Sequence, residues 1–349
     1  MLEKVIKSIG SLDDTSLGKA QERLDDLTKP KGSLGRLEEI AKQICGIKGK
    51  IVEKIEKKVI YVLAADHGVV SEGVSAYPQE VTPQMVYNFL GGGAGINVLA
   101  DHIGADVRVV DMGIAGDMQG VKGLIDKKIS KGTDNMAQGP AMSKRQAVAS
   151  IESGIELALK ANDEGFDILG TGDMGIGNTT ASSAITALVC DKEISQVTGY
   201  GTGIDKEGFK KKIRIIDKAI KVNSPDPSDG IDVLSKIGGF EIGGIAGLIL
   251  GCASKRMPVV IDGFISGAGA LIAAIICPGS KDFMIASHCS VEIGHISILK
   301  KLGLKPMFDF DMRLGEGTGA ALGISIAEAS IKVLNGMATF SEAGVSEKK

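Results

Sequence analysis

The chain has 349 residues and a formal net charge of −3. This length allows one large domain or two modest ones, and the slightly acidic balance lacks the basic footprint of a nucleic-acid-binding protein. The longest apolar runs, near residues 242–250 and 268–277, are too short and glycine-rich to cross a membrane, and the charged start is unlike a signal peptide. Five cysteines without a CxxC spacing predict free thiols. Together these features predict a cytoplasmic protein.

Residues 1–56 have a charged, helical pattern and no strand signal. Apolar residues recur every three or four positions from Leu34 to Ile44, which predicts an amphipathic helix with Ser33 as its N-cap. We expect residues 1–56 and the last helix, about residues 320–349, to form a small helical domain from both chain ends. Residues 57–319 then form the large catalytic domain.

Strand signals alternate with helical segments through the large domain. Most of these runs end in a polar or glycine-rich turn before a helix, which predicts an α/β fold with a doubly wound, mostly parallel sheet. Ligands bind such sheets at the carboxyl ends of the strands. The six predicted strands are residues 59–65, 107–112, 166–170, 258–262, 283–287 and 307–312.

The stretch from Arg313 to Ala320 follows the last predicted strand and opens a helix of small residues. Glu316 is flanked there by glycines, whose backbone lets a substrate approach closely. A carboxylate in such a turn is either a general base or an N-terminal residue that complements the helix dipole. The two interpretations have equal support from this stretch alone.

Other polar turns follow the same pattern. Residues 171–180 form a glycine-rich turn before a helix, a typical anion site, but match neither the P-loop nor GxGxxG. This argues against a nucleoside triphosphate or dinucleotide site, and so against a dehydrogenase. Asp66 and His67 either contact substrate or, more in keeping with the pattern, brace a strand end. Residues 91–95 either bind a ligand or join two helices, and the sequence slightly favours the second interpretation. No third ligand accompanies His288 and His295, so no metal site is predicted.

Five motifs, in their order along the chain, resemble those of one family, the nicotinate-nucleotide:dimethylbenzimidazole phosphoribosyltransferases of cobamide assembly. The resemblance covers essentially the whole chain. The motifs are Thr28-Lys-Pro-Lys-Gly-Ser-Leu-Gly-Arg-Leu-Glu38, Asp66-His-Gly-Val-Val70, Gly73-Val-Ser-Ala-Tyr-Pro78, Gly172-Asp-Met-Gly-Ile-Gly-Asn-Thr-Thr180 and Arg313-Leu-Gly-Glu-Gly-Thr-Gly319. The resemblance implies a Rossmann-like fold and a homodimer. It also implies that ribose 5-phosphate passes from nicotinate mononucleotide to an aromatic base, without a cofactor, nucleic acid or membrane.

The resemblance also implies roles for individual residues. Glu316 matches the base that deprotonates the acceptor, and Asp173 matches a carboxylate beside the ribose. Lys212 and Ser290 match the phosphate contacts, aided by the turn at Gly175–Gly177. The remaining substrate-binding positions carried over are Tyr77, Pro78, Gln84, Met85, Asn178, Thr179, Leu314 and Gly315.

Two positions depart from the family pattern. Asp173 stands where the family usually has Glu, and Tyr200 replaces an arginine in a Gly-Arg-Gly-Thr-Gly sequence. The departures leave open two alternatives: a subunit that transfers to phenol or p-cresol and pairs with a similar chain, and a non-catalytic nucleotide-binding homologue. They also leave the preferred acceptor open.

Overall fold

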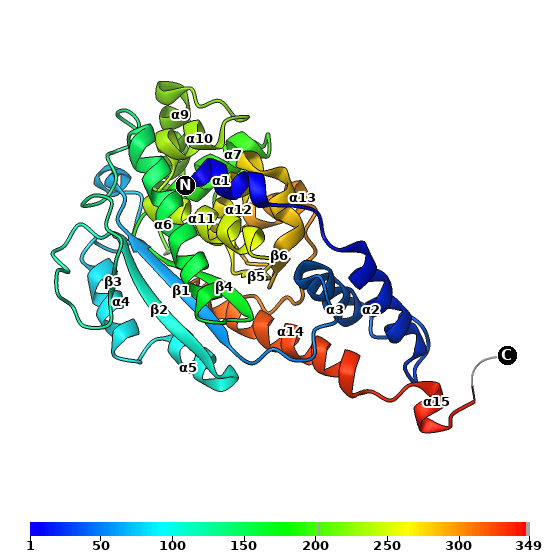
Figure 1. Ribbon diagram of the computed structural model, residues 1–349. Coiled ribbons are helices and arrows are strands. Elements are labelled where there is room, and N and C mark those ends of the chain that lie inside the picture. Colours follow the sequence, from blue (N-terminus) through cyan, green and yellow to red (C-terminus); the bar gives the residue numbers. More distant parts are fainter. Residues whose placement is uncertain (202, 347–349) are drawn as a thin grey trace.

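The computed structural model describes residues 1–201 and 203–346, so Thr202 of the 199–203 turn and residues 347–349 of the predicted small domain lie outside the described residues. A parallel sheet with helices on both faces forms the centre of the molecule (Figure 1). Its strands run in the order β3-β2-β1-β4-β5-β6, and every described pairing is parallel. This confirms the predicted doubly wound α/β fold. The strands are β1 (Lys58–Ala65), β2 (Ala105–Gly113), β3 (Ile125–Asp126), β4 (Ile168–Met174), β5 (Val259–Ile261) and β6 (Met284–Ala286).

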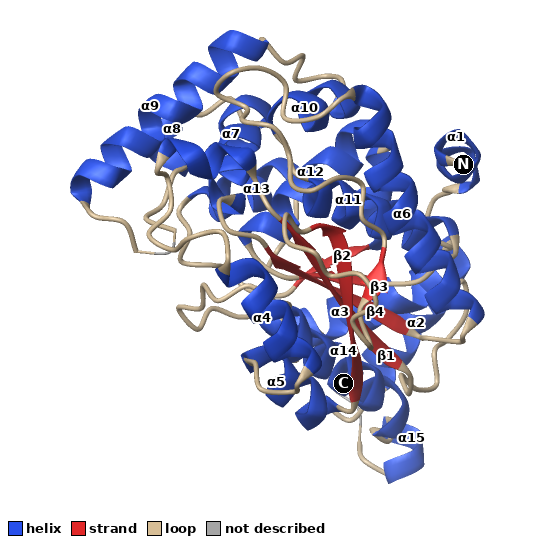
Figure 2. Cartoon of the chain, turned by 90° about the vertical axis from the view of Figure 1, so that its left-hand side faces the viewer, coloured by secondary structure: helices blue, strands red, loops and turns tan. Residues whose placement is uncertain are grey.

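Helices surround the strands on all sides (Figure 2). None of those within the described residues combines the length and apolar content that a membrane crossing requires. Their bounds are α1 (Leu2–Ser8), α2 (Asp14–Asp26), α3 (Arg36–Lys48), α4 (Val81–Leu90), α5 (Gly95–Ile103), α6 (Lys144–Asp163), α7 (Asn178–Val189), α8 (Ile194–Val197), α9 (Lys206–Asn223), α10 (Gly230–Ile237), α11 (Phe240–Ser254), α12 (Phe264–Ile276), α13 (Gly294–Leu302), α14 (Thr318–Gly336) and α15 (Phe340–Ala343), with 3₁₀ turns at Gly68–Glu72 and Pro278–Phe283.

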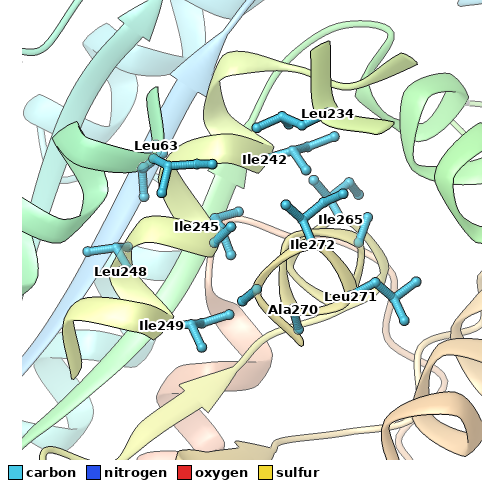
Figure 3. Packing of buried hydrophobic residues seen from close by; sticks show 14 of the residues in the cluster. Leu63, Leu234, Ile242, Ile245, Leu248, Ile249, Ile265, Ala270, Leu271 and Ile272 are labelled. Atoms are coloured by element: carbon cyan, nitrogen blue, oxygen red, sulfur yellow. The ribbon is translucent and has the colours of Figure 1, made fainter. Parts of the chain in front are cut away.

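Strand β1 separates two hydrophobic cores. Its odd-numbered residues from 59 to 63 pack with α6, α11 and α12, and its even-numbered residues from 60 to 64 pack with α3, α5 and α14. Burial on both faces is what a central strand of a parallel sheet requires. Figure 3 shows the first core, where Ile245 of α11 lies between Leu63 of β1 and Ile272 of α12.

The high glycine content has a packing role in this first core. A Cβ added to Gly154 of α6 would overlap the carbonyl of Gly244 of α11, and one added to Gly244 would overlap Leu63. The two helices therefore meet backbone to backbone and α11 lies directly on β1. This close packing holds the strand ends, and the turns that follow them, in fixed positions.

The predicted sixth strand at residues 307–312 is wrong. That segment is an extended loop whose only strand-like contact within the described residues is a bridge between Phe308 and His288. Asp309 and Phe310 are exposed, and Asp311 has a left-handed φ of 55°. Polar residues alternate through this run, so it does not bury both faces as an inner strand must. The sixth strand is instead β3, two residues long, at the opposite edge of the sheet.

The predicted N-cap of the third helix is also wrong. Ser33 belongs to a turn in which its backbone N–H donates to the carbonyl of Pro30 at 3.1 Å. The chain then passes through Gly35, with φ 52°, before α3 begins at Arg36. A left-handed residue cannot continue a helix, so the helix starts only after this glycine.

Both chain ends meet at one end of α14. The Arg23 side chain of α2 donates to the carbonyl of Leu334 at 2.7 Å, and Leu27 forms a bridge with Thr339. By contrast, α1 packs against α6 and α11 of the large core, and its Leu2 and Val5 belong to that core (Figure 1). The division into residues 1–56 with 320–349, and 57–319, stays a prediction.

Candidate active site

A cavity of about 480 Å³ opens at the carboxyl ends of the strands. Its walls come from the end of β4, the starts of α7 and α12, the segment after β6 and the turn before α14. The order of the strands reverses between β1 and β4, the place at which open parallel sheets bind ligands. A larger hollow of about 1190 Å³ lies between α2 and α15, but it contains none of the predicted site residues.

Most of the predicted site residues line the smaller cavity. The exceptions are Pro78, Gln84, Gly177 and Lys212, which are absent from its wall. Segments far apart in the sequence are therefore brought together at one edge of the sheet. The predicted residues in the wall are Tyr77, Met85, Asp173, Gly175, Asn178, Thr179, Ser290, Leu314, Gly315 and Glu316.

Glu316 lies in a tight turn directly before α14. It has a left-handed φ of 62°, which is uncommon for a residue other than glycine, and its side chain is buried. Its Oε2 accepts a hydrogen bond from the backbone N–H of Ile96, at 3.4 Å, in the first turn of α5. Burial raises the pKa of the Glu316 carboxyl, the Ile96 N–H lowers it, and the nearby Asp262 raises it further. A carboxylate with a raised pKa is a better base.

Asp173 is the second carboxyl group in the wall, at the end of β4. One oxygen, Oδ2, accepts from the amide of Asn178 at 3.0 Å, and Oδ1 has no hydrogen-bond partner within the described residues. Burial, followed by the charges of Asp262 and Glu241, raises the pKa of Asp173 well above its usual range. Within the described part of the chain, Oδ1 is thus a buried acceptor without a partner, in a residue of the cavity wall.

A buried lysine lies behind the opposite wall, near the start of α7. The Nζ of Lys212 donates to Thr179 Oγ1 at 2.8 Å, and a Cβ added to Gly201 would lie 3.2 Å from that nitrogen. Burial lowers the pKa of Lys212 to about 8, although the Glu292 carboxylate acts in the other direction. A buried ammonium group beside a helix N-terminus favours a phosphate.

Apolar side chains form the mouth of the cavity. Tyr77 and Leu314 are 53% and 60% exposed, and Met85 of α4 lies between them and the second core. Pro78 and Gln84 are exposed to solvent. An open apolar rim beside two carboxyl groups suits a flat aromatic molecule with an ionisable nitrogen or oxygen.

Comparisons with known proteins agree on one family. Residues 9–345 match a family model described as phosphoribosyltransferase. Nicotinate-nucleotide–dimethylbenzimidazole phosphoribosyltransferases from Geobacter metallireducens and Chloroflexus aggregans are 56% and 55% identical, over 99% and 100% of this chain and 98% and 99% of theirs. A crystal structure of the enzyme so named from Thermus thermophilus is 43% identical, has a TM-score of 0.91, and covers 97% of this chain and 100% of its own.

The chain belongs to this phosphoribosyltransferase family. One departure from the family pattern lies in the cavity wall, and the other directly precedes Gly201, which also lines the cavity. Asp173 lines the cavity. Tyr200 is 46% exposed and stacks on Phe209 of α9, with ring centroids 4.8 Å apart. The tyrosine therefore makes an apolar contact with α9 in place of the fixed positive charge of an arginine.

Asp66 and His67 brace the fold in this phosphoribosyltransferase. Neither lies in the wall of the cavity. His67 Nε2 lies 2.6 Å from Glu241 Oε1, and both side chains are almost completely buried. Asp66 Oδ2 accepts from the backbone N–H of Ala115 at 2.8 Å, which ties the end of β1 to the loop after β2. These contacts support the bracing interpretation of the pair.

Sequence reasoning missed several contributors to the site, including a buried carboxyl group, a histidine and a loop. Asp262 follows β5 and lies behind Glu316. A polar residue at the end of a predicted strand is a signal that could have identified it. His288 lines the cavity, where the absence of metal-ligand spacing suggested only a structural role. The Gly91–Gly95 loop, which the sequence suggested mainly joins two helices, leads into the first turn of α5, and this turn contacts Glu316. Nothing in the sequence signals that last contact.

Proposed function

We propose that this protein transfers the 5-phosphoribosyl group of nicotinate mononucleotide to 5,6-dimethylbenzimidazole or a related aromatic base. The products are nicotinate and an α-riboside 5-phosphate for the nucleotide loop of a cobamide. The observation that carries the proposal is that one cavity contains two carboxyl groups, a helix start that suits a phosphate, and an apolar rim. The chain is also 53–56% identical to relatives named for this reaction.

The proposed step breaks the bond between ribose C1′ and the pyridinium nitrogen. The electron pair stays on that nitrogen, so nicotinate leaves without being protonated. A nitrogen of the acceptor forms the new bond to C1′ from the opposite face. The proton on the other ring nitrogen of the acceptor passes to the Glu316 carboxylate, which makes Glu316 the general base.

Asp173 is proposed to stabilise positive charge that develops on the ribose. This role requires the ionised carboxylate, whereas burial in the free protein favours the protonated form. The positively charged pyridinium ring of a bound nicotinate mononucleotide favours the ionised form, because a nearby opposite charge lowers a carboxyl pKa. The position of Asp173 in the wall of the cavity supports this role.

The phosphate is proposed to bind at the opposite end of the cavity. Lys212, Ser290 and Thr179 supply polar groups there, and the turn Gly175–Gly177 leads into α7. Tyr77, Met85 and Leu314 are proposed to hold the acceptor ring. Pro78 and Gln84 remain proposed contacts, although both are exposed outside the wall of the cavity.

We also propose a cytoplasmic homodimer. All five cysteines are free, as is usual where thiols are kept reduced. The segment before Glu316 exposes two apolar side chains, Phe310 at 65% and Leu314 at 60%, which a second copy would cover. A heterodimer with a similar chain is the alternative arrangement, and light scattering of the purified chain distinguishes the two.

The deciding experiment is nicotinate release from nicotinate mononucleotide by the purified chain alone, with 5,6-dimethylbenzimidazole and then phenol as acceptor. Release with the benzimidazole supports the proposal. Release with phenol alone assigns the chain to the phenolic branch, for which Asp173 and Tyr200 are the motivating departures. Release with neither contradicts the proposal for the chain alone and leaves a missing partner subunit or the non-catalytic nucleotide-binding homologue.

A further inference from the structure

Asp262 is a buried carboxyl group that follows β5 and lies beneath the turn of Glu316. Its Oδ2 accepts from the backbone N–H of Gly317 at 3.2 Å, and its Oδ1 accepts from that of Ala320 at 3.0 Å. Only 1% of the residue is exposed. Both donors belong to the start of α14, so Asp262 caps this helix from another part of the chain.

The turn needs a cap of this kind. Gly315, Glu316 and Gly317 have φ values of 79°, 62° and 93°, three consecutive left-handed residues. Gly317 is the N-cap of α14 and has no side chain with which to cap it. A left-handed conformation at Glu316 is unfavourable and persists only where neighbouring contacts impose it. The two hydrogen bonds to Asp262 are contacts of this kind.

Asp262 is itself held rigidly. Its backbone N–H donates to Thr171 Oγ1 at 3.2 Å, and its carbonyl accepts from Ser287 Oγ at 2.8 Å. These contacts join it to β4 and to the residue after β6. The carboxyl group therefore has a fixed position relative to the cavity wall.

Three titratable groups face Asp262 from the elements packed around it: Asp173 at the end of β4, His288 after β6 and Glu316 before α14. The Asp262 charge raises the pKa of Asp173 and of Glu316. Burial raises the pKa of Asp262 itself, while His288 and the backbone N–H groups at the start of α14 lower it and favour the charged form. A negative charge behind Glu316 increases the affinity of Glu316 for a proton.

We propose that Asp262 is a positioning residue for Glu316: its two oxygens fix the left-handed turn, and its negative charge makes Glu316 a stronger base. This inference rests on the proposed function, in which Glu316 accepts the acceptor proton. Asp262 touches the backbone of the turn and has no direct role in bond making.

The test is Asp262→Asn, which keeps the shape but removes the charge and one acceptor oxygen. We expect kcat to fall by about tenfold or more, with KM for nicotinate mononucleotide nearly unchanged. The acid limb of the kcat profile should move to lower pH by about one unit, because Glu316 loses a neighbouring negative charge. An unchanged acid limb contradicts the proposal, whatever the value of kcat.

Asp111→Asn is the matched control. Asp111 is similarly buried, lies near the end of β2 and accepts from the backbone N–H of Ile114 at 2.9 Å, but it lies outside the cavity. Its substitution should lower stability and leave the acid limb in place. Should Asp262→Asn fail to fold, Asp262→Glu keeps the charge and displaces the carboxylate: a fall in kcat with the acid limb unmoved supports the proposal, and unchanged kcat contradicts it.

A second readout separates this inference from the proposed function. The Glu316 carboxyl is titrated by ¹³C NMR in glutamate-labelled protein, with Glu316→Gln used for assignment. A lower Glu316 pKa in Asp262→Asn supports the inference even if the chain releases no nicotinate. An identical titration in both proteins overturns it, and nicotinate release by the unsubstituted chain is scored separately.

Discussion

The backbone N–H of Ile96 lies 3.4 Å from Oε2 of Glu316, so the first turn of α5 meets the carboxylate proposed as the base. Gly95 leaves room for Leu314 beside this contact, because a Cβ there would lie 3.0 Å from Leu314 Cδ2. The start of α5 stabilises the ionised carboxylate, whereas burial and Asp262 favour its proton. The balance keeps Glu316 ionisable and basic in a partly desolvated site.

Replacing Glu316 with Gln should remove most of the turnover. The amide has nearly the same shape but cannot accept a proton, and loss of a general base typically costs about 10²–10⁴ in rate. Binding of nicotinate mononucleotide, measured by calorimetry, should stay within a few fold. In the unsubstituted protein, kcat should fall as the pH drops through the raised pKa of Glu316. A variant with near-native kcat would show that another group is the base.

Binding of nicotinate mononucleotide should weaken above about pH 8, where the buried Lys212 loses its proton in the free protein. A phosphate needs the charged ammonium, so Kd should rise by up to about tenfold per pH unit above this pKa. Lys212→Met should weaken binding by about tenfold to a hundredfold and abolish this dependence. Lys211→Met, at the exposed neighbouring position, is the control and should retain it. Equal pH dependence in both variants would contradict the phosphate role.

Gly172→Ala should reduce activity by moving the backbone of Glu316. An added Cβ would lie 2.5 Å from the Glu316 carbonyl oxygen and 2.9 Å from the nitrogen of Gly317. Displacement of a reacting group by about 1 Å can cost roughly a hundredfold in rate.

Gly170→Ala is the matched control on the same strand. Its added Cβ would meet side-chain atoms of Ile60, Ala320 and Ile324 at 3.0–3.2 Å, and no backbone atoms of the turn. Both variants should lose about 1–3 kcal/mol in the free energy of unfolding, measured with urea. Only Gly172→Ala should lower kcat strongly. Equal kcat in the two variants would contradict the idea that Gly172 positions the backbone of Glu316.

Glu241→Gln should destabilise the fold, because His67 and Glu241 form a pair that is almost completely buried. Loss of one charge from such a pair costs about 3–5 kcal/mol. Burial lowers the pKa of His67, but Glu241 outweighs it and raises the pKa above 6.5. The folded protein therefore binds the proton more tightly than the unfolded chain does. The stabilisation is full below about pH 6.5 and is lost as the pH rises through the raised pKa.

Urea unfolding at several pH values checks this prediction. Above pH 6.5, the free energy of unfolding should decrease more for the unsubstituted protein than for Glu241→Gln. Glu156→Gln breaks an exposed pair with Lys127 at 2.6 Å and should cost no more than about 1 kcal/mol at any of these pH values. Parallel pH profiles for the unsubstituted protein and Glu241→Gln would contradict the charged pair.

Local patterns in the sequence determined most of the elements. Five of the six predicted strands exist, because each is a short apolar run bounded by polar or glycine-rich residues. The cap of α6 is Ser143, which accepts from the N–H of Gln146 three residues later. The family motifs also placed Glu316 and Asp173 in one cavity wall. All of these signals lie within a few residues of the feature that they predict.

The tertiary structure alone decided which segments meet. Residues 307–312 look like a strand, yet the sheet ends at β6 and gains β3 at its other edge. The contacts of Glu316 with Ile96 and of Asp262 with Gly317 join residues 220 and 55 positions apart. Such contacts depend on the packing of α5, β5 and α14 against a common sheet, and no local periodicity encodes them. The sequence determined the elements and the family, and the packing determined how the candidate base is held.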